Sequence, residues 1–263
     1  MFDEGFVSKK VQDLLLLAKN RGSFRLPVEP SEIANLCSVV SVEDRPMIPE
    51  GVLAPVPGGF KVFLQDNFAS DPGSRIRRRF TFAHELVHTF FYSVEGNSPR
   101  AMKGAPRGPK LERLCQFGAG EILVPEFLLK QNLPSGKAAS AEDLLQLAAT
   151  FDVSLEVIFR RIQKLGLVAE DEFAAALVDR AQDGTEIVQA ACYGSLLLCN
   201  LPRPKRGMEF DTWVEPLRAL GGPDLGSRAA ITTQTAEVRT RKVHRSRRSY
   251  IFELKFARLK KPE

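Results

Sequence analysis

The residues best suited to chemistry lie in one apolar segment, Arg79-Phe-Thr-Phe-Ala-His-Glu-Leu-Val-His-Thr-Phe-Phe91. Because the segment contains no proline or glycine, it predicts a buried helix. On a helix, His84 and His88 stand one turn apart on the same face, so both imidazoles can reach one metal ion. Glu85 lies beside them, placed to contact a metal-bound water. These residues predict zinc-dependent hydrolysis, in which zinc lowers the pKa of its water and a carboxylate takes the proton.

The competing interpretation is a pair of hydrogen-bonded core histidines beside an unrelated glutamate. Only three histidines occur in the chain, and two of them fall at this spacing, which favours the metal site. A third ligand would decide between the two interpretations. A metzincin is excluded, because Phe91 and Val94 stand where that class requires glycine and histidine.

The third ligand is predicted on the segment Leu111–Pro125, which has helical periodicity and ends at a proline. Glu112 shares a helical face with the small residues of this segment. Glu121 lies about 180° around the same helix, at roughly 100° per residue. Glu95 stands in an irregular loop shortly after His88. We predict Glu112 as the ligand because of the face it occupies, and Glu95 and Glu121 stay open as alternatives.

The elements around these residues predict an α+β fold with a zincin-like catalytic core. Helical spacing at 6–20 and 31–36 is followed by a β-branched run at 39–42. Two further runs, 51–55 and 59–64, are separated by a Pro-Gly-Gly turn and predict a hairpin. We therefore expect a small antiparallel sheet before the histidine helix, with its last strand as the edge on which an extended substrate docks.

Two signals indicate how the histidine helix is held. The small residues Gly118–Gly120 lower helix propensity, which predicts that another backbone comes close to them. The basic residues Arg75, Arg77, Arg78 and Arg79 precede the histidines. We favour a solvated first turn for them. Because cations are mildly unfavourable at a helix N-terminus, the alternative is that one or more of these arginines pair with acidic groups elsewhere.

The composition is that of an ordinary soluble globular protein. The chain has 263 residues, with 44% hydrophobic and 26% charged residues, and suits a principal domain with a smaller companion. Its net charge of +5 permits an acidic partner without requiring one. Four cysteines without a C-x-x-C pair indicate reduced thiols, and neither a signal peptide nor a membrane-spanning run is present. We predict a cytoplasmic protein without a membrane partner.

A known family shares these motifs. The stretch Arg79–His88, followed by Glu112-x-x-Cys-Gln-x-x-Ala-x-x-Ile-Leu-Val-Pro125, resembles the ImmA/IrrE family of bacterial metallopeptidases. The N-terminal helix, the Pro-Val-Glu-Pro-Ser-Glu-Ile-Ala segment and the strand pair also fit that pattern, so the resemblance spans roughly residues 6–165.

The resemblance implies roles for the motif residues. It implies that His84, His88 and Glu112 are the zinc ligands of a gluzincin-like site and that Glu85 is the general base. It also implies site-specific cleavage of cytoplasmic helix-turn-helix repressors of the XRE type. Such cleavage releases genes of stress response or mobile elements.

Three positions depart from the family pattern. Val87 stands where glycine is frequent, Tyr92 where another histidine is often found, and Gly118 replaces a common phenylalanine. None of these changes removes a ligand. Tyr92 follows His88 by one turn and is a candidate for polarising the scissile carbonyl; the favoured alternative is a core tyrosine with a bonded hydroxyl.

Residues 136–168 predict two short helices across a turn, similar to a helix-turn-helix, with Ser140 as a cap. Arg160, Arg161 and Lys164 could meet DNA phosphates. An ordinary helical pair packed on the peptidase explains the same sequence, and we favour this structural interpretation.

The remaining chain, 169–263, carries weaker signals. Residues 173–180 predict a helix, while 186–200 and 229–256 have β-type patterning. Family relatives carry a GAF-like sensory domain here, and the resemblance to it is weak. The basic stretch 239–261 is expected to be a solvated strand face or tail, with DNA contact as the less favoured alternative.

We therefore predict a zinc metallopeptidase domain at 1–135, a helix-turn-helix-like segment at 136–168 and an α/β C-terminal sensor or recognition domain at 169–263. The predicted function is cleavage of a helix-turn-helix repressor with Zn²⁺, for which Mn²⁺ or Fe²⁺ could substitute in the cell. The alternative is a non-proteolytic DNA-binding or sensory transcription regulator with a structural metal site.

Overall fold

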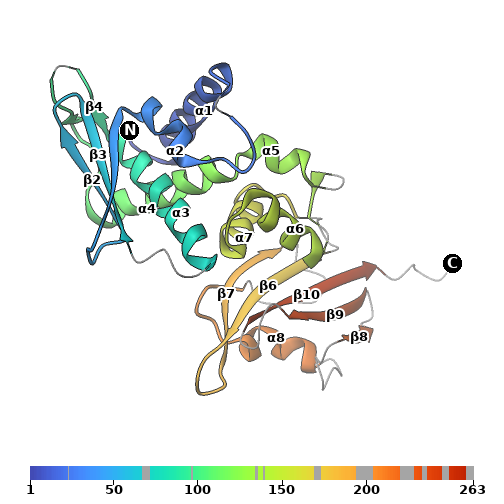
Figure 1. Ribbon diagram of the computed structural model, residues 1–263. Coiled ribbons are helices and arrows are strands. Elements are labelled where there is room, and N and C mark those ends of the chain that lie inside the picture. Colours follow the sequence, from blue (N-terminus) through green and yellow to red (C-terminus); the bar gives the residue numbers. More distant parts are fainter. Residues whose placement is uncertain are drawn as a thin grey trace. The chain divides into compact units, whose positions relative to one another are not determined.

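The computed structural model of the chain contains helices and sheets in two compact units, and the predicted α+β class is confirmed (Figure 1). One unit comprises Met1–Glu126 with Thr150–Ser154, and the other comprises Phe127–Ala149 with Leu155–Glu263. None of the described helices is long and apolar enough to cross a membrane. The structure describes residues 1–22, 24–66, 72–95, 97–133, 136–138, 140–168, 173–193, 204–219, 228–232, 236–244 and 249–258.

The first unit carries the histidine motif on the helix α3, Pro72–His88. The first helix of this unit begins where the Asp3 carboxylate accepts a hydrogen bond from the Phe6 backbone N–H. The buried face of that helix includes Val7. The other elements of this unit are α1 (Glu4–Asn20), α2 (Pro30–Ile33), η1 (Ala34–Cys37), β1 (Val39–Arg45), β2 (Gly51–Val56), β3 (Gly59–Gln65), η3 (Thr89–Phe91), β4 (Tyr92–Ser93), β5 (Arg100–Ala101) and α4 (Gly108–Leu123).

The small sheet has the strand order β1-β3-β2. The predicted hairpin is confirmed as the antiparallel pair β2 and β3, but β1 pairs with β3 in parallel, so the sheet is mixed and not antiparallel as predicted. The last strand is central, which makes the prediction of β3 as the free edge wrong. Fully buried Phe60, Val62 and Leu64 explain this position, because β3 supplies the apolar face of the sheet. The outer strands are β1 and β2.

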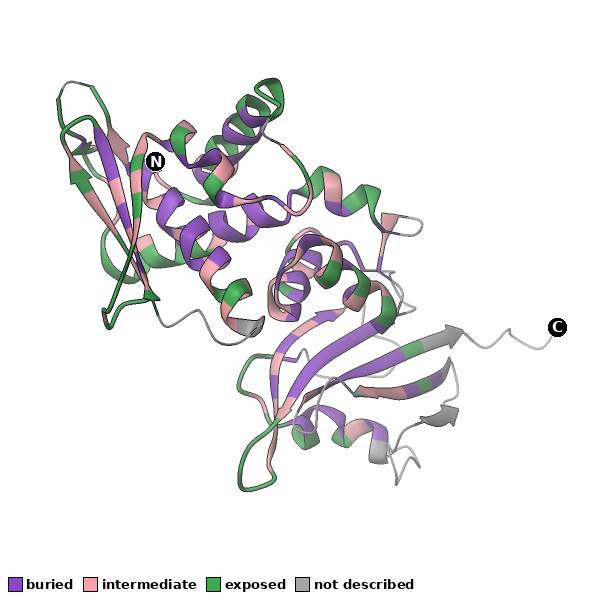
Figure 2. Cartoon of the chain, viewed as in Figure 1, coloured by how far each residue is buried: buried purple, intermediate pink, exposed green. Residues whose placement is uncertain are grey.

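The helices α3 and α4 pack against each other through buried faces (Figure 2). A Cβ atom added at Gly118 would lie 2.7 Å from a methyl of Val7 and 2.8 and 2.9 Å from the two methyls of Val87. Glycine is therefore required where α4 meets α1 and α3, as the small residues of this segment predict. Two departures from the family pattern, at positions 87 and 118, thus lie in direct contact.

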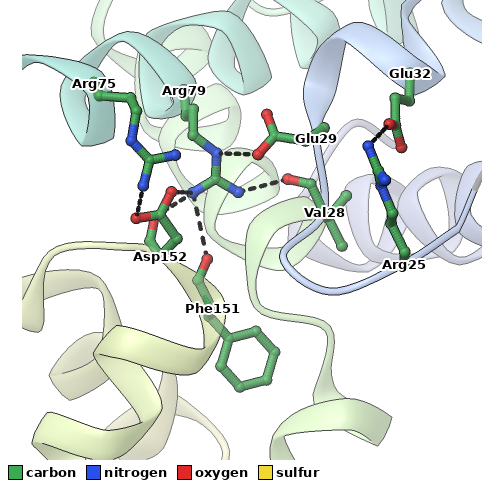
Figure 3. A network of polar contacts seen from close by, with 8 residues as sticks. All are labelled: Arg25, Val28, Glu29, Glu32, Arg75, Arg79, Phe151 and Asp152. Atoms are coloured by element: carbon green, nitrogen blue, oxygen red, sulfur yellow. Dashed lines mark hydrogen bonds and ion pairs between the residues drawn. The ribbon is translucent and has the colours of Figure 1, made fainter.

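An arginine network holds α3 to two loops of the same unit (Figure 3). Arg79 is buried and donates hydrogen bonds to the Val28 carbonyl, at 2.7 Å, and to the Asp152 carboxylate, at 2.8 Å, as well as to the Asp152 carbonyl. Its Nε lies 3.1 Å from a Glu29 carboxylate oxygen, an ion pair without hydrogen-bond alignment. Arg75 also pairs with Asp152. Pairing with distant acidic groups, the less favoured alternative, is therefore confirmed for Arg75 and Arg79.

The second unit contains the two predicted short helices, of which the first is capped by the Ser140 hydroxyl, 3.2 Å from the Asp143 backbone N–H. Of the candidate phosphate contacts, Arg161 is buried and Arg160 pairs with Glu156 at 2.6 Å. The elements are α5 (Glu126–Gln131), α6 (Ala141–Phe151), α7 (Leu155–Lys164), β6 (Phe173–Arg180), β7 (Glu186–Tyr193), α8 (Phe210–Ala219), β8 (Arg228–Thr232), β9 (Ala236–His244) and β10 (Ser249–Arg258).

The five-stranded sheet of this unit is antiparallel throughout, in the order β7-β6-β10-β9-β8. The predicted helix at 173–180 is wrong, because this segment is the strand β6. The predicted β patterning is confirmed for β7 to β10, while 194–200 lies outside the described residues. Side chains of β6 and β10 pack with Trp213 of α8 on one face. On the opposite face of the sheet, the Glu253 carboxylate accepts a hydrogen bond from the Ala141 backbone N–H of α6.

Candidate metal centre

The histidines predicted as ligands converge on one point. His84 and His88 lie one turn apart on α3, and their Nε2 atoms are 3.1 Å apart. Both side chains are mostly buried, with 14% and 17% of their surface exposed. Two ring nitrogens that face each other at this distance are arranged to share one cation.

The neighbouring helix brings the predicted third ligand to the same point. On α4, Glu112 places one carboxylate oxygen 3.1 Å from His84 Nε2 and the other 3.8 Å from His88 Nε2. The alternative Glu121 instead accepts a hydrogen bond from the Ser8 hydroxyl at 2.7 Å. Glu95 lies exposed after β4, where its backbone N–H bonds to the Ser93 hydroxyl. The two alternatives therefore contact other parts of the unit, and Glu112 lies at the histidines.

A cysteine absent from the sequence-based prediction completes this cluster. Cys115 is fully buried on α4, and its sulfur lies within 4.8 Å of the donor nitrogens of His84 and His88. Together the three side chains form a group that could hold a metal ion. Cys115 follows Glu112 by three residues, so the shared helical face was a signal that could have identified it.

Burial keeps the imidazoles in the form that binds metal. It lowers the pKa of His84, against the opposing effect of the nearby Glu112 carboxylate. Burial and then the charge of His84 lower the pKa of His88. Neutral imidazoles with free lone pairs are therefore favoured at neutral pH, and neutral histidine is the metal-binding form.

The motif glutamate is held against the edge strand. Glu85 is buried, and burial together with the nearby Glu112 raises its pKa to about 7, against the effect of a hydrogen bond from the Leu53 backbone. A Cβ atom added at Gly51 would lie 2.7 Å from Glu85 Oε1. Glycine at the start of β2 thus leaves the space in which this carboxylate lies. An isolated glycine in a strand pattern signals a close approach by another group, but it does not identify Glu85 as that group.

Tyr92 lies at the end of η3, with its ring packed edge-on against Phe60 at 5.3 Å between centroids. It lines a pocket of about 240 Å³ together with residues of α1 and the turn at Leu36–Ser38. The pocket is not lined by His84, His88, Glu112 or Cys115. The role of Tyr92 in stabilising a transition state stays a prediction.

Residues 70–163 match the family described as the IrrE N-terminal-like domain, Peptidase_M78. The resemblance to the ImmA/IrrE family is therefore confirmed over a region that contains the histidine motif and Glu112. The matched region is therefore similar to a metallopeptidase domain.

A solved structure described as a Mycobacterium tuberculosis transcriptional regulator is similar at 14% identity, covering 96% of this chain and 78% of that chain, with a TM-score of 0.45. No curated protein matches the sequence.

The side chains at this site fit a divalent metal ion. Two neutral imidazoles, the Glu112 carboxylate and the Cys115 thiol are the nitrogen, oxygen and sulfur donors that zinc takes in proteins. The donors come from two packed helices, so their positions are fixed by the core between α3 and α4.

Proposed function

We propose that the chain is a cytoplasmic zinc-dependent metalloendopeptidase that cleaves a helix-turn-helix repressor of the XRE type. Cleavage would derepress stress-response or mobile-element genes. The observation that carries the proposal is the convergence of His84, His88 and Glu112 beside the buried carboxylate of Glu85. The match to a metallopeptidase domain supports the reaction class.

His84, His88 and Glu112 would hold the metal, and zinc would supply Lewis acidity to the site when bound. Glu85 acts as the general base: its carboxylate accepts a proton from the attacking water and later donates it to the leaving amine. A raised pKa of about 7 suits both steps, because a group that titrates near the working pH exchanges protons readily. Manganese or iron in the same donor set is the alternative in the cell.

The strand β2 is the proposed docking edge for the substrate. It is an outer strand of the sheet, and its Leu53 backbone hydrogen-bonds to Glu85. An extended peptide that pairs with this edge would therefore lie beside the general base. Repressor linkers that can become extended fit this mode of binding better than folded domains.

The region 169–263 is proposed to sense a signal or recognise the substrate. Its antiparallel sheet carries α8 on one face, which gives it a core of its own. This arrangement supports an independently folded sensor, and a GAF-like identity remains part of the proposal.

One observation favours a second function, that of a regulator with a structural metal. Cys115 lies with the two histidines in a group that could hold a metal ion, and cysteine ligands are typical of structural zinc sites. Direct DNA binding by α6 and α7 belongs to this second proposal. Full-length protein that is retained on DNA in a salt-dependent manner and cleaves no repressor would favour it.

The test of the first function is cleavage of the repressor encoded nearest the gene. Wild-type protein is expected to produce two defined fragments, and a chelator should prevent their formation. Glu85→Gln should bind metal as the wild type does and produce no fragments. Retained cleavage by that variant would contradict the assignment of the general base, and His84→Ala should lose the metal.

A further inference from the structure

The metal centre contains more donors than the predicted peptidase site requires. Three side chains, His84, His88 and Glu112, suffice for a catalytic zinc that keeps one position open. Cys115 adds a sulfur within 4.8 Å of both histidine nitrogens. The position is one helical turn from Glu112 on α4, so both donors face α3.

This placement distinguishes Cys115 from other buried cysteines of the chain. Cys37 and Cys192 are also buried and free, but among the described residues neither belongs to a cluster of potential metal ligands. A cysteine that merely fills space has no reason to lie beside two imidazoles whose nitrogens converge. The cluster therefore points to metal binding.

We propose that Cys115 is a metal ligand and that its thiolate makes the site prefer thiophilic divalent cations, Zn²⁺ and Cd²⁺, over Mn²⁺. The inference rests on the proposed function for the presence of a metal at this site. When the metal binds, the thiol S–H bond breaks, a sulfur–metal bond forms and the proton leaves to solvent. Soft sulfur ligands select soft or borderline cations, whereas manganese prefers oxygen donors.

Cobalt substitution of the full-length protein tests the proposal. Cobalt bound to sulfur absorbs in the near ultraviolet by charge transfer, and cobalt bound only to nitrogen and oxygen does not. We expect this absorption in the wild type and in Cys37→Ala, a matched buried-cysteine control. We expect its loss in Cys115→Ala and in the nearly isosteric Cys115→Ser. Competition titrations should show that Cys115→Ser weakens Cd²⁺ binding by at least about tenfold, with Mn²⁺ binding changed less than about twofold.

Two results would overturn the proposal: no charge-transfer band in cobalt-loaded wild type, or an undiminished band in Cys115→Ser. Circular dichroism of each variant shows whether a lost band reflects unfolding, and Cys115→Ser retains the size of the side chain if Cys115→Ala does not fold. Failure of the proposed function gives a different result. A sulfur band together with normal repressor cleavage by Glu85→Gln refutes the peptidase mechanism and leaves the Cys115 ligand in place.

Discussion

Gly51→Ala is expected to displace Glu85, the proposed general base, while leaving the proposed metal ligands intact. The added Cβ would lie 2.7 Å from Glu85 Oε1 and 2.7 Å from a methyl carbon of Thr81. Ordinary contact begins at 3.4 Å, so the carboxylate or the strand must move by about 0.7 Å. The carboxylate is the flexible end of its side chain and is therefore the group expected to move.

The expected loss follows from this displacement. A misplacement of about 1 Å can cost about 100-fold in rate, so we expect kcat to fall about 10- to 100-fold. Removing a general base costs about 10²- to 10⁴-fold, so Gly51→Ala should lie between the wild type and Glu85→Gln. Metal content should change little, because the atoms nearest to the added carbon belong to Glu85 and Thr81 and not to the predicted metal ligands.

The assay is steady-state cleavage of the repressor with metal content measured for each variant. Gly5→Ala is the matched control, because its Cβ would meet only Asp3 Oδ1, at an ordinary 3.4 Å. Thermal unfolding shows whether Gly51→Ala remains folded. A folded, metal-loaded Gly51→Ala with wild-type kcat would refute the placement of Glu85 by β2.

Three further predictions concern the ligand set and the stability of each unit. Glu112→Ala should lower metal affinity by at least about tenfold in equilibrium titrations, since it removes a charged donor; unchanged affinity would show that the histidines and Cys115 suffice. Gly118→Ala should destabilise the protein by about 1–3 kcal/mol through overpacking, and adding Val87→Ala should recover part of this loss; strictly additive effects in denaturant unfolding would contradict the contact. Burial alone would raise the pKa of Glu186, but hydrogen bonds from Tyr250 and Arg180 outweigh it and hold this pKa below its usual range. Its stabilising contribution is therefore present above an unfolded pKa of about 4.3 and is lost as pH falls through the lower folded pKa, so Glu186→Gln should flatten the acid limb of stability against pH.

The donor cluster was largely predictable from sequence because its spacing is local. His84, Glu85 and His88 lie within one helical turn, and the periodicity of α4 separates Glu112 from Glu121 by half a rotation. Cys115 and Gly51 were missed for different reasons. Cys115 lies on the same helical face as Glu112, so the periodicity of α4 could have identified it. The contact of Gly51 with Glu85 depends on how β2 packs against α3, and residue spacing along the chain does not encode this packing.

The sheets were less predictable because pairing joins distant segments. The hairpin of β2 and β3 follows from its turn, but the parallel partner β1 does not, so the edge was assigned to the wrong strand. The segment Phe173–Arg180 contains three consecutive alanines, which favour a helix by propensity. Pairing with β7 and β10 on both sides, and burial on both faces, make it a strand. Tertiary packing thus overrides local preference there.

The buried guanidinium of Arg79 limits how the catalytic unit can be excised. A fragment that ends near residue 126 would keep Arg79 and lose Asp152, together with the carbonyls of Phe151 and Asp152 that accept its hydrogen bonds. Removing one partner of a buried charge pair costs about 3–5 kcal/mol, a large share of the stability of a small domain. A minimal peptidase must therefore extend through Ser154, or carry a neutral replacement for Arg79.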